Sequence, residues 1–313
     1  MKRVYLDQNK WIDLAATHKT LPKAQRFQDA LLVAEEGVER GFVSFPLSSF
    51  HYLETSRRGN PDSRFDLAAT MAGLSRLHTI APHSCLLGPE VDRALRVIFG
   101  VPHEPRTAQV FGYGVHHAFG VEAPPWLRDT NAHGLRDWVE FQLLALNDDG
   151  PVAMPEIDEI AKQWADSQSD RQQQRAQDGW HRGERGGRLA KVEAYAHHHE
   201  VIGEGLQRAG LHWGHLYELG QEGLSAFIEA VPLIHVGAEL QRIRHAQPQK
   251  GWEPNDLNDL GALTLGVVYC DVVVTERQWV DALQRARLPE RYGTEVLSDL
   301  TALPAVLVGQ PNA

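Results

Sequence analysis

The sequence predicts an α/β fold in which a short parallel sheet is interrupted by a mainly α-helical insertion. Short apolar runs alternate with amphipathic helical stretches over residues 1–98, and the alternation returns over residues 248–313. Short strands separated by helices of this kind are typical of parallel sheets. Residues 99–247 lack the alternation and show mostly helical spacing. We therefore expect one domain built from residues 1–98 and 248–313, and a helical insertion over residues 99–247.

Within the two α/β pieces, strands and helices are bounded by recognisable signals. The expected strands are the apolar runs at 4–6, 42–45, 78–81, 272–275 and 294–297. Proline opens or ends several elements: Pro22 lies near the start of one helix, Pro46 ends the second strand, and Pro61 opens another helix. Ser48 or Ser49 is suited to cap the helix that follows Pro46. Further helices are expected over 89–97, 256–268 and 279–285.

The insertion is expected to consist of helices joined by one long polar stretch. Helical spacing covers Leu135–Leu146, Pro155–Ala165, Leu189–Leu219 and Leu224–Ala246. Between Asp166 and Gly187 the chain is rich in Gln, Arg and Gly, and we expect this stretch to lack regular structure. Structureless stretches of that length inside a compact domain tend to be functional or disordered.

Composition excludes several classes of protein. The chain has 313 residues, of which 42% are hydrophobic, so a wholly disordered protein is excluded. Its two cysteines exclude a disulfide scaffold, and no apolar run approaches the roughly 20 residues needed to span a bilayer. We expect a cytoplasmic protein that makes no membrane contact. With 31 Lys+Arg against 41 Asp+Glu, the net charge of −10 argues against indiscriminate coating of nucleic acid.

Carboxylates follow the strands of the predicted sheet at equivalent places. Asp7 follows the first strand, Glu54 lies on the helix after the second, and Glu276 follows the run 272–275. Asp256 and Asp259 open the preceding helix. Parallel sheets bind ligands beyond the carboxyl ends of their strands. Carboxylates gathered there would repel one another unless a cation lay between them, and oxygen ligands of this kind suit Mg²⁺ or Mn²⁺.

Each of these acids also has a purely structural interpretation. Asp7 and Glu276 stand where helix N-caps are expected, and Asp256 with Asp259 would complement a helix dipole. Glu54 would be an ordinary solvated helix residue. Taken one at a time the structural interpretations are favoured, but the shared placement of all five acids favours a common site.

The motifs around these acids resemble those of PIN-domain nucleases. The run VYLDQN at 4–9 is similar to the opening of that family, an apolar strand followed by an Asp and, two places on, an Asn. SSFHYLE at 48–54 resembles the second acidic motif. DLGA at 259–262, with its step of sixteen residues from Asp259 to Thr275, resembles the third. Many members carry a fourth acid two residues after the Thr, where this chain has Arg277, and Glu276 is the substitute.

The resemblance implies a PIN-like three-layer domain and a metal-dependent endoribonuclease, with a toxin or defence effector as one biological setting. It implies catalysis by Asp7, Glu54, Asp259 and Glu276, a Mg²⁺ or Mn²⁺ site made by these acids with Asp256, and supporting roles for Asn9 and Thr275. The implied partners are an RNA substrate and either a protein inhibitor (antitoxin) or a second copy. A catalytically weak PIN-like interaction scaffold and a DNA structure-specific nuclease remain as alternatives.

Arginines near the acids and in the insertion are candidates for phosphate contacts. Arg57 and Arg58 follow Glu54 closely, and six basic residues, among them Arg171, Arg182 and Arg185, lie between Arg171 and Lys191. Flexible Arg/Gly segments with an aromatic residue hold phosphates and stack bases. A solvated connection between two helices is the equally weighted alternative.

A run of histidines in the insertion is not expected to bind zinc. Residues 197–199 are three consecutive histidines, and consecutive residues of a helix point about 100° apart, so they do not share one tetrahedral zinc ion. A solvated or packed helix is the favoured interpretation there.

Overall fold

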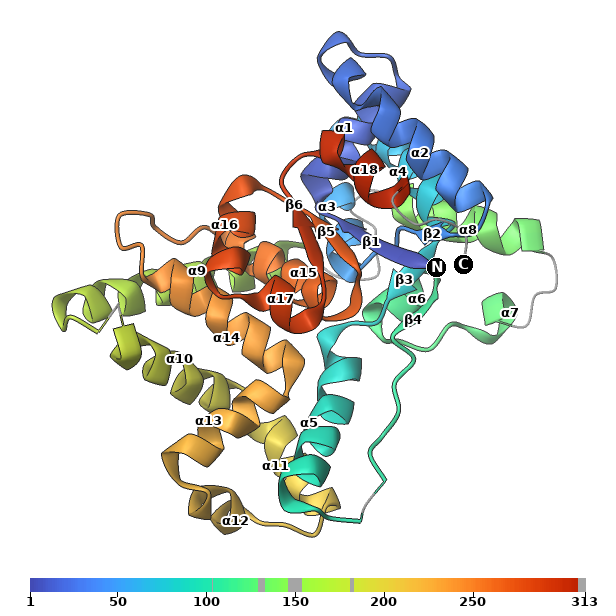
Figure 1. The fold of residues 1–313 in the computed structure, drawn as a ribbon. Helices are drawn as coiled ribbons and strands as arrows, with labels where there is room; N and C mark the ends of the chain where they lie inside the picture. Colours follow the sequence, from blue (N-terminus) through green and yellow to red (C-terminus); the bar gives the residue numbers. More distant parts are fainter. Residues whose placement is uncertain (103, 129–132, 146–153, 181–182, 309–313) are drawn as a thin grey trace. The chain divides into compact units, whose positions relative to one another are not determined.

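The computed structural model describes residues 1–102, 104–128, 133–145, 154–180 and 183–308 (Figure 1). Its contacts divide the chain into two units. The first, here called the sheet unit, comprises Met1–Pro82, Val110–Ile157 and Leu265–Ala313. The second, the helical unit, comprises His83–Gln109 and Asp158–Thr264. This division groups residues by contact, and the domain boundaries expected at 98 and 248 stay a prediction.

A four-stranded parallel sheet forms the centre of the sheet unit. Its strands are β1 (Lys2–Leu6), β2 (Val43–Ser44), β5 (Val272–Val274) and β6 (Glu295–Leu297), in the order β2-β1-β5-β6 (Figure 1). Val4 pairs with Val272 and Leu6 with Val274. All three residues of β5 are buried, as expected for a parallel strand covered on both faces. The short parallel sheet, and with it the α/β class, is confirmed within a chain that is mostly helical.

A second sheet has only two strands, which run antiparallel. β3 (His78–Ile80) is the predicted third strand, and its partner β4 (Phe111–Tyr113) was not predicted. The three residues Phe-Gly-Tyr of β4 lie in a stretch rich in Gly, Pro and His, where no apolar run marks a strand. A single parallel bridge joins Leu47, beyond the end of β2, to Thr79 of β3.

Two helices of the sheet unit begin at the predicted signals, whereas the chain after Pro22 forms a 3₁₀ turn before α2 begins at Gln28. Ser48 is the N-cap of α3, and Pro61 is the first residue of α4. The helices are α1 (Gln8–His18), α2 (Gln28–Glu39), α3 (Ser49–Ser56), α4 (Pro61–Ser75), α6 (Gly114–Phe119), α7 (Pro125–Arg128), α8 (His133–Ala145), α16 (Arg277–Arg285), α17 (Leu288–Tyr292) and α18 (Leu303–Val308), with 3₁₀ turns η1 (Pro22–Phe27) and η2 (Leu300–Ala302).

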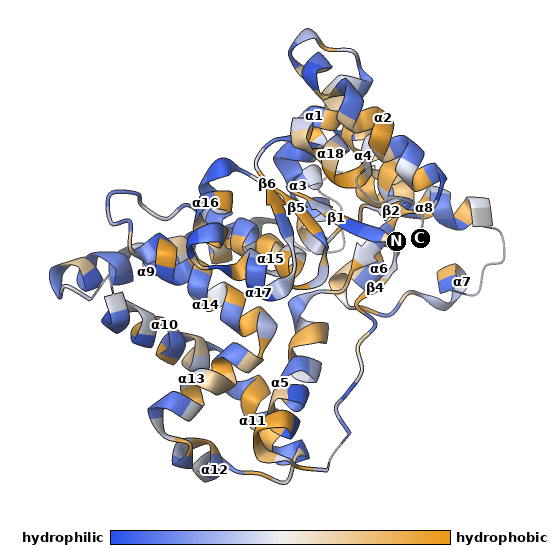
Figure 2. Cartoon of the chain, viewed as in Figure 1, coloured by the Kyte–Doolittle hydropathy of each residue, from blue (hydrophilic) through white to orange (hydrophobic). Residues whose placement is uncertain are grey.

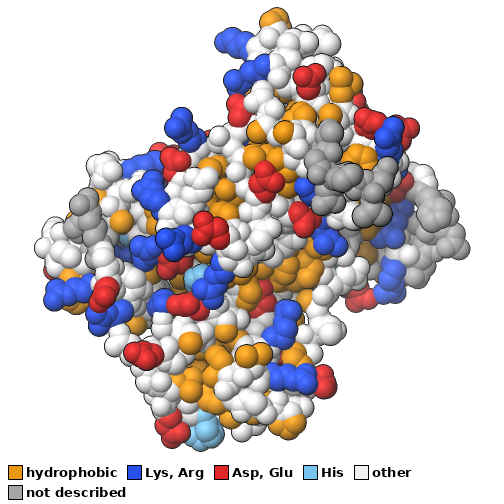
Figure 3. Space-filling model, viewed as in Figure 1, with side chains coloured by type: hydrophobic (Ala, Val, Ile, Leu, Met, Phe, Trp, Pro, Cys, Tyr) orange, Lys and Arg blue, Asp and Glu red, His pale blue; other side chains and the backbone are white. Residues whose placement is uncertain are grey.

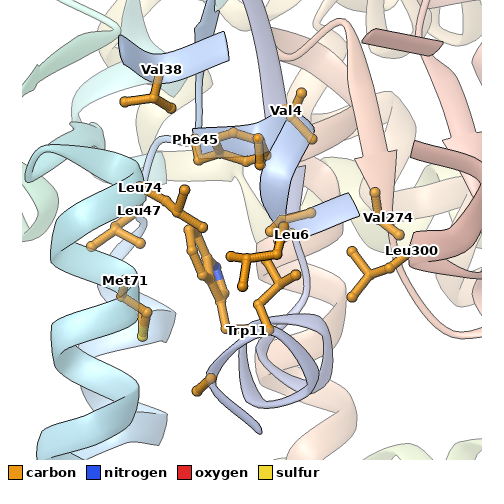
Figure 4. Close-up of a cluster of buried hydrophobic side chains, with 14 of the residues drawn as sticks. Val4, Leu6, Trp11, Val38, Phe45, Leu47, Met71, Leu74, Val274 and Leu300 are labelled. Atoms are coloured by element: carbon orange, nitrogen blue, oxygen red, sulfur yellow. The ribbon is translucent and has the colours of Figure 1, made fainter. Parts of the chain in front are cut away.

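The apolar core of this unit joins residues that are distant in sequence. Trp11 of α1 and Phe45 pack edge to face, with ring centroids 6.2 Å apart. Leu6 of β1, Met71 of α4 and Leu300 belong to the same buried cluster (Figure 4). Apolar residues concentrate on β5 and on α2 (Figure 2), which explains why the short strands are stable.

The helical unit contains α5 (His83–Phe99), α10 (Gly183–His197), α11 (His199–Arg208), α12 (Trp213–Glu218), α13 (Gly220–Ala230) and α14 (Pro232–His245). Two longer helices, α9 (Met154–Gln177) and α15 (Pro254–Tyr269), lie mostly in this unit and extend into the residues of the sheet unit. Its buried cluster includes Leu95 of α5, Ile202 of α11 and Phe227 of α13.

Several predicted boundaries in this unit were wrong. The polar stretch after Asp166 is helical as far as Gln177 and again from Gly183, because Gln, Arg and Ala are good helix formers even without an apolar stripe. Helix α5 begins at His83 and carries Pro89 inside it. Pro232 separates α13 from α14, where one helix was expected.

No single helix among the described residues is long and apolar enough to cross a membrane. In the part of the chain that the structure describes, only α13 and α14 taken together, with a bend of 105° between them, reach that length and composition.

Candidate functional site

The strand order creates a switch point between β1 and β5. From β1 the chain continues to β2 on one side, and from β5 it continues to β6 on the other. Open parallel sheets bind ligands beyond the carboxyl ends of their strands at the place where the order reverses in this way. Asp7 directly follows β1, and Thr275 and Glu276 directly follow β5. Three of the predicted residues therefore lie at the switch point.

Asp7 is held by a residue of the neighbouring strand end. It occupies the N-cap position of α1, yet within the described residues its side chain forms no cap hydrogen bond. Its Oδ2 instead accepts a hydrogen bond of 2.8 Å from the hydroxyl of Thr275, which is fully buried. Across the sheet edge, the end of β5 thus orients the acid that follows β1.

The negative charge of Asp7 is disfavoured by its surroundings. Burial raises the pKa of this carboxyl group, and the charge of Glu276 raises it further. The Thr275 hydroxyl, the Gln8 amide and the charge of Lys10 lower the pKa, but burial is the largest influence. A half-buried carboxylate next to another acid is a typical feature of functional sites, because nothing in folding alone rewards it.

Glu276 shows the converse arrangement. It stands at the N-cap position of α16, and within the described part of the chain its side chain likewise forms no cap hydrogen bond. Its Oε1 accepts a hydrogen bond of 2.8 Å from Asn9 Nδ2 of α1, and its Oε2 accepts one of 2.8 Å from Gln278 Nε2. The acid after β5 is therefore oriented by α1, just as the acid after β1 is oriented by the end of β5.

Glu54 approaches the same region from α3. Its side chain is half-buried. Burial raises the pKa of the Tyr5 hydroxyl, and the negative charges of Asp7 and Glu54 both raise it further. Both carboxylates therefore lie close enough to the buried ring of Tyr5 to act on it electrostatically. A closer meeting of Glu54 with Asp7 and Glu276 stays a prediction.

Asp256 and Asp259 belong to the helical unit, in the first turns of α15. Asp256 is buried, and its Oδ2 accepts hydrogen bonds from Arg244 Nη2 at 2.8 Å and from the Glu253 amide at 3.0 Å. It thus forms a buried ion pair and a local cap, as the structural interpretation expected. Asp259 is half-buried, and its Oδ1 accepts a hydrogen bond of 3.1 Å from Asn255 Nδ2. A meeting of these two acids with Asp7 stays a prediction.

The donor chemistry of the sheet-unit acids suits a hard divalent cation. All three offer carboxylate oxygens, and the disfavoured charge of Asp7 is one that a cation would relieve. In the described part of the chain, however, no group of three or more His, Cys, Asp or Glu side chains lies close enough together to hold a metal ion. The Mg²⁺ or Mn²⁺ site therefore stays a prediction.

The predicted phosphate-binding arginines differ in their surroundings. Arg57 and Arg58 are half-buried at the end of α3, and Arg58 Nη2 donates a hydrogen bond of 2.8 Å to Ser63 Oγ. Arg185 is exposed on α10, and Arg171 is exposed on α9. Arg182 lies outside the described residues.

One arginine of the polar stretch is unsuited to contact a ligand. Arg175 is buried and forms an ion pair with Glu193, so it joins α9 to α10. On the face seen in Figure 3, basic and acidic side chains are interspersed. The stretch is therefore a pair of helices with a few exposed arginines, and the expectation of a flexible Arg/Gly segment was wrong for its described residues.

The sequence interpretation missed two residues near the site. Lys10 Nζ donates a hydrogen bond of 3.0 Å to the carbonyl of Ser298, the residue after β6. The charge of Lys10 lowers the pKa of Asp7. His51 is buried between β1 and α3. The signal for Lys10 was local, because it lies three residues after Asp7 in the first turn of α1. No local signal marked His51, whose contacts depend on how β1 lies against the start of α3.

Comparison of the chain with protein-family models, curated proteins and solved structures found no match.

Proposed function

We propose that this protein is a PIN-like, metal-dependent endoribonuclease whose reaction takes place at the carboxyl end of the sheet, between β1 and β5. One observation carries the proposal. Asp7 and Glu276 each stand at a helix N-cap, and each accepts a hydrogen bond from across the sheet edge, from Thr275 and Asn9 respectively. Two acids oriented reciprocally at a switch point are suited to a shared ligand.

The proposed cofactor is Mg²⁺ or Mn²⁺, held by Asp7, Glu54 and Glu276 of the sheet unit. When bound, a divalent cation lowers the pKa of the attacking water and neutralises charge on the phosphate. The Thr275 hydroxyl keeps Asp7 Oδ2 in one orientation, and the Asn9 amide does the same for Glu276 Oε1. Supporting hydrogen bonds of this kind fix ligand geometry.

The remaining residues of the site would handle the polyanionic substrate. The Lys10 ammonium has three donor hydrogens, and the Ser298 carbonyl accepts one of them. Lys10 would therefore contact a phosphate oxygen beside Asp7. In-line attack of water on the phosphorus would break the bond to the 3′-oxygen, leaving a 5′-phosphate on one fragment and a 3′-hydroxyl on the other.

A cleavage assay with three substrates tests the proposal. The full chain is incubated with single-stranded RNA, single-stranded DNA of the same sequence and a DNA flap, each with Mn²⁺ or with EDTA. We expect Mn²⁺-dependent cleavage of the RNA, its loss in Asp7→Asn, and its retention in Asp29→Asn, which changes an exposed acid of α2.

The outcomes separate the proposal from its alternatives. Cleavage of the flap alone would identify a DNA structure-specific nuclease. Cleavage of no substrate, with the same RNA affinity in wild type and Asp7→Asn, would identify a PIN-like scaffold. Cleavage that persists in Asp7→Asn would refute the assignment of the site.

A further inference from the structure

The buried imidazole of His51 connects the end of β1 to the start of α3. His51 is 2% exposed; its Nδ1 lies 2.9 Å from the Ser48 amide nitrogen and its Nε2 lies 2.8 Å from the Leu6 carbonyl oxygen. An amide N–H only donates and a carbonyl only accepts, so Nδ1 is the acceptor and Nε2 carries the proton. The imidazole is therefore neutral and in a single tautomer, in keeping with burial that lowers its pKa to about 4.

The register of the sheet explains why an imidazole stands there. Lys2 pairs with Val43 and Arg3 with Ser44, an offset of 44 − 3 = 41 residues. Continued to Leu6, the same offset gives residue 6 + 41 = 47, and a parallel ladder would then bring the Ser48 amide to the Leu6 carbonyl. His51 replaces that hydrogen bond with two, one on each side of its ring.

The strands separate at this point for a local reason. Pro46 has no amide hydrogen to continue the ladder with β1. Leu47 pairs with β3 instead. Its amide donates a hydrogen bond of 2.9 Å to the His78 carbonyl, and its carbonyl accepts one of 2.7 Å from the Ile80 amide. A gap therefore opens beside β1 next to Asp7, and the imidazole fills it.

Two further buried contacts flank the imidazole. The Tyr5 and Ser48 hydroxyl oxygens lie 2.8 Å apart, and Gln8 Nε2 donates a hydrogen bond of 3.0 Å to Thr55 Oγ1. Residues 5, 6 and 8 are thus joined to α3 on both sides of Asp7. On α3, the joined residues 51 and 55 stand on both sides of Glu54.

We propose that His51 is a positioning residue, whose neutral imidazole sets the separation of Asp7 and Glu54 so that both can bind the same divalent cation. The inference rests on the proposed function, and it assigns to His51 no contact with substrate. Of its contacts to Ser48 and Leu6, the one to the Leu6 carbonyl has the greater effect, because Leu6 is bonded directly to Asp7. Two carboxylates that share an ion must be held to within about 0.5 Å.

Variants that keep one contact at a time test this assignment. The amide nitrogen of Gln reaches about as far as Nε2 of His, so His51→Gln retains a donor for Leu6. The shorter Asn retains only an acceptor for Ser48, and His51→Leu removes both contacts. His235→Leu, which changes a buried histidine of the helical unit, controls for a general loss of stability.

The readout is the Mn²⁺ affinity of the full chain, measured from the electron paramagnetic resonance signal of free Mn²⁺. The melting temperature is measured in parallel. We expect His51→Leu and His51→Asn to weaken Mn²⁺ binding by about 10- to 100-fold. His51→Gln should stay within about threefold of wild type, and His235→Leu should bind Mn²⁺ normally whatever its melting temperature.

The possible failures are distinct. If the wild type binds no Mn²⁺, the proposed function falls and the role of His51 falls with it. If the wild type binds Mn²⁺ and folded His51→Leu binds equally well, only the positioning role is refuted. Should His51→Leu fail to fold, the comparison of Gln with Asn decides, and equal Mn²⁺ affinities of those two variants would overturn the proposal.

Discussion

Replacing Asp7 by Asn tests whether this acid serves function or folding. The amide oxygen of Asn can accept the same hydrogen bond from Thr275 that Asp7 Oδ2 accepts at 2.8 Å. The negative charge, which burial and Glu276 disfavour, is removed. The attraction to Lys10 is lost as well, but it is the smallest of the influences on the pKa of Asp7. Without metal we therefore expect Asp7→Asn to be more stable than the wild type.

The expected gain in the free energy of unfolding follows from the stability that functional residues usually cost a protein. Replacing a functional group whose charge is disfavoured commonly adds about 0.5–2 kcal/mol to the free energy of unfolding. At roughly 2–4 °C per kcal/mol, the melting temperature would rise by a few degrees. Because the pKa of Asp7 is raised in the folded state, the gain exists at neutral pH. It disappears as the pH falls through that pKa, since the wild-type carboxyl group is then neutral too.

Manganese should reverse the order of the two proteins. A ligand at 100 times its Kd stabilises a folded protein by about 2.7 kcal/mol, and Asp7→Asn would lose most of that gain. Loss of several kcal/mol of transition-state stabilisation also predicts a roughly 10³-fold slower cleavage.

The assay is thermal unfolding of both proteins at neutral and acidic pH, with EDTA and with Mn²⁺. A metal-free Asp7→Asn that melts below the wild type at neutral pH would show that Asp7 stabilises the fold, and the reasoning would be refuted.

Three further predictions follow from other parts of the chain. Asp256→Asn should lower the free energy of unfolding by about 3 kcal/mol, because it leaves a buried arginine without its charged partner, whereas Asp259→Asn should leave stability nearly unchanged. Equal losses for the two variants in a denaturant titration would refute this distinction. The double change of the exposed Arg171 and Arg185 to Gln should reduce the salt slope of single-stranded RNA binding by about 1.4, and an unchanged slope would exclude these helices from the RNA-binding surface. Burial lowers the pKa of His51 and of other imidazoles from 6.5 to about 4 or below, so the unfolded chain binds more protons than the folded chain between those pH values. The free energy of unfolding should therefore fall below pH 6.5 by about 1.4 kcal/mol per pH unit for each such group, which urea titrations at pH 7 and pH 5 would measure.

Local patterns alone determined the fold class and the candidate acids. The strand β5 could be predicted because three consecutive valines favour a buried strand. The starts of α3 and α4 could be predicted because Ser48 and Pro61 act through their own backbone neighbourhood. The places of Asp7 and Glu276, directly after strands, follow from the same local patterns.

The tertiary structure decided which structural role each acid plays. Asp7, Glu276 and Asp256 all stand near helix starts in sequence, and nothing local distinguishes them. Only the strand order brings Thr275 to Asp7 and Asn9 to Glu276, while the packing of α14 against the start of α15 gives Asp256 a buried arginine. Those partners are up to 268 residues away, so no local pattern encodes them.

The same distinction explains the errors and the unforeseen histidine. Helix propensity without an apolar stripe made the stretch after Asp166 look unstructured, although Arg175 is stabilised there by an ion pair with α10. His51 could not be recognised from sequence because its role depends on the register of two strands and on where Pro46 makes them part. Short-range preferences select helices and strands, but the energies of buried polar groups depend on long-range partners that only the folded chain supplies.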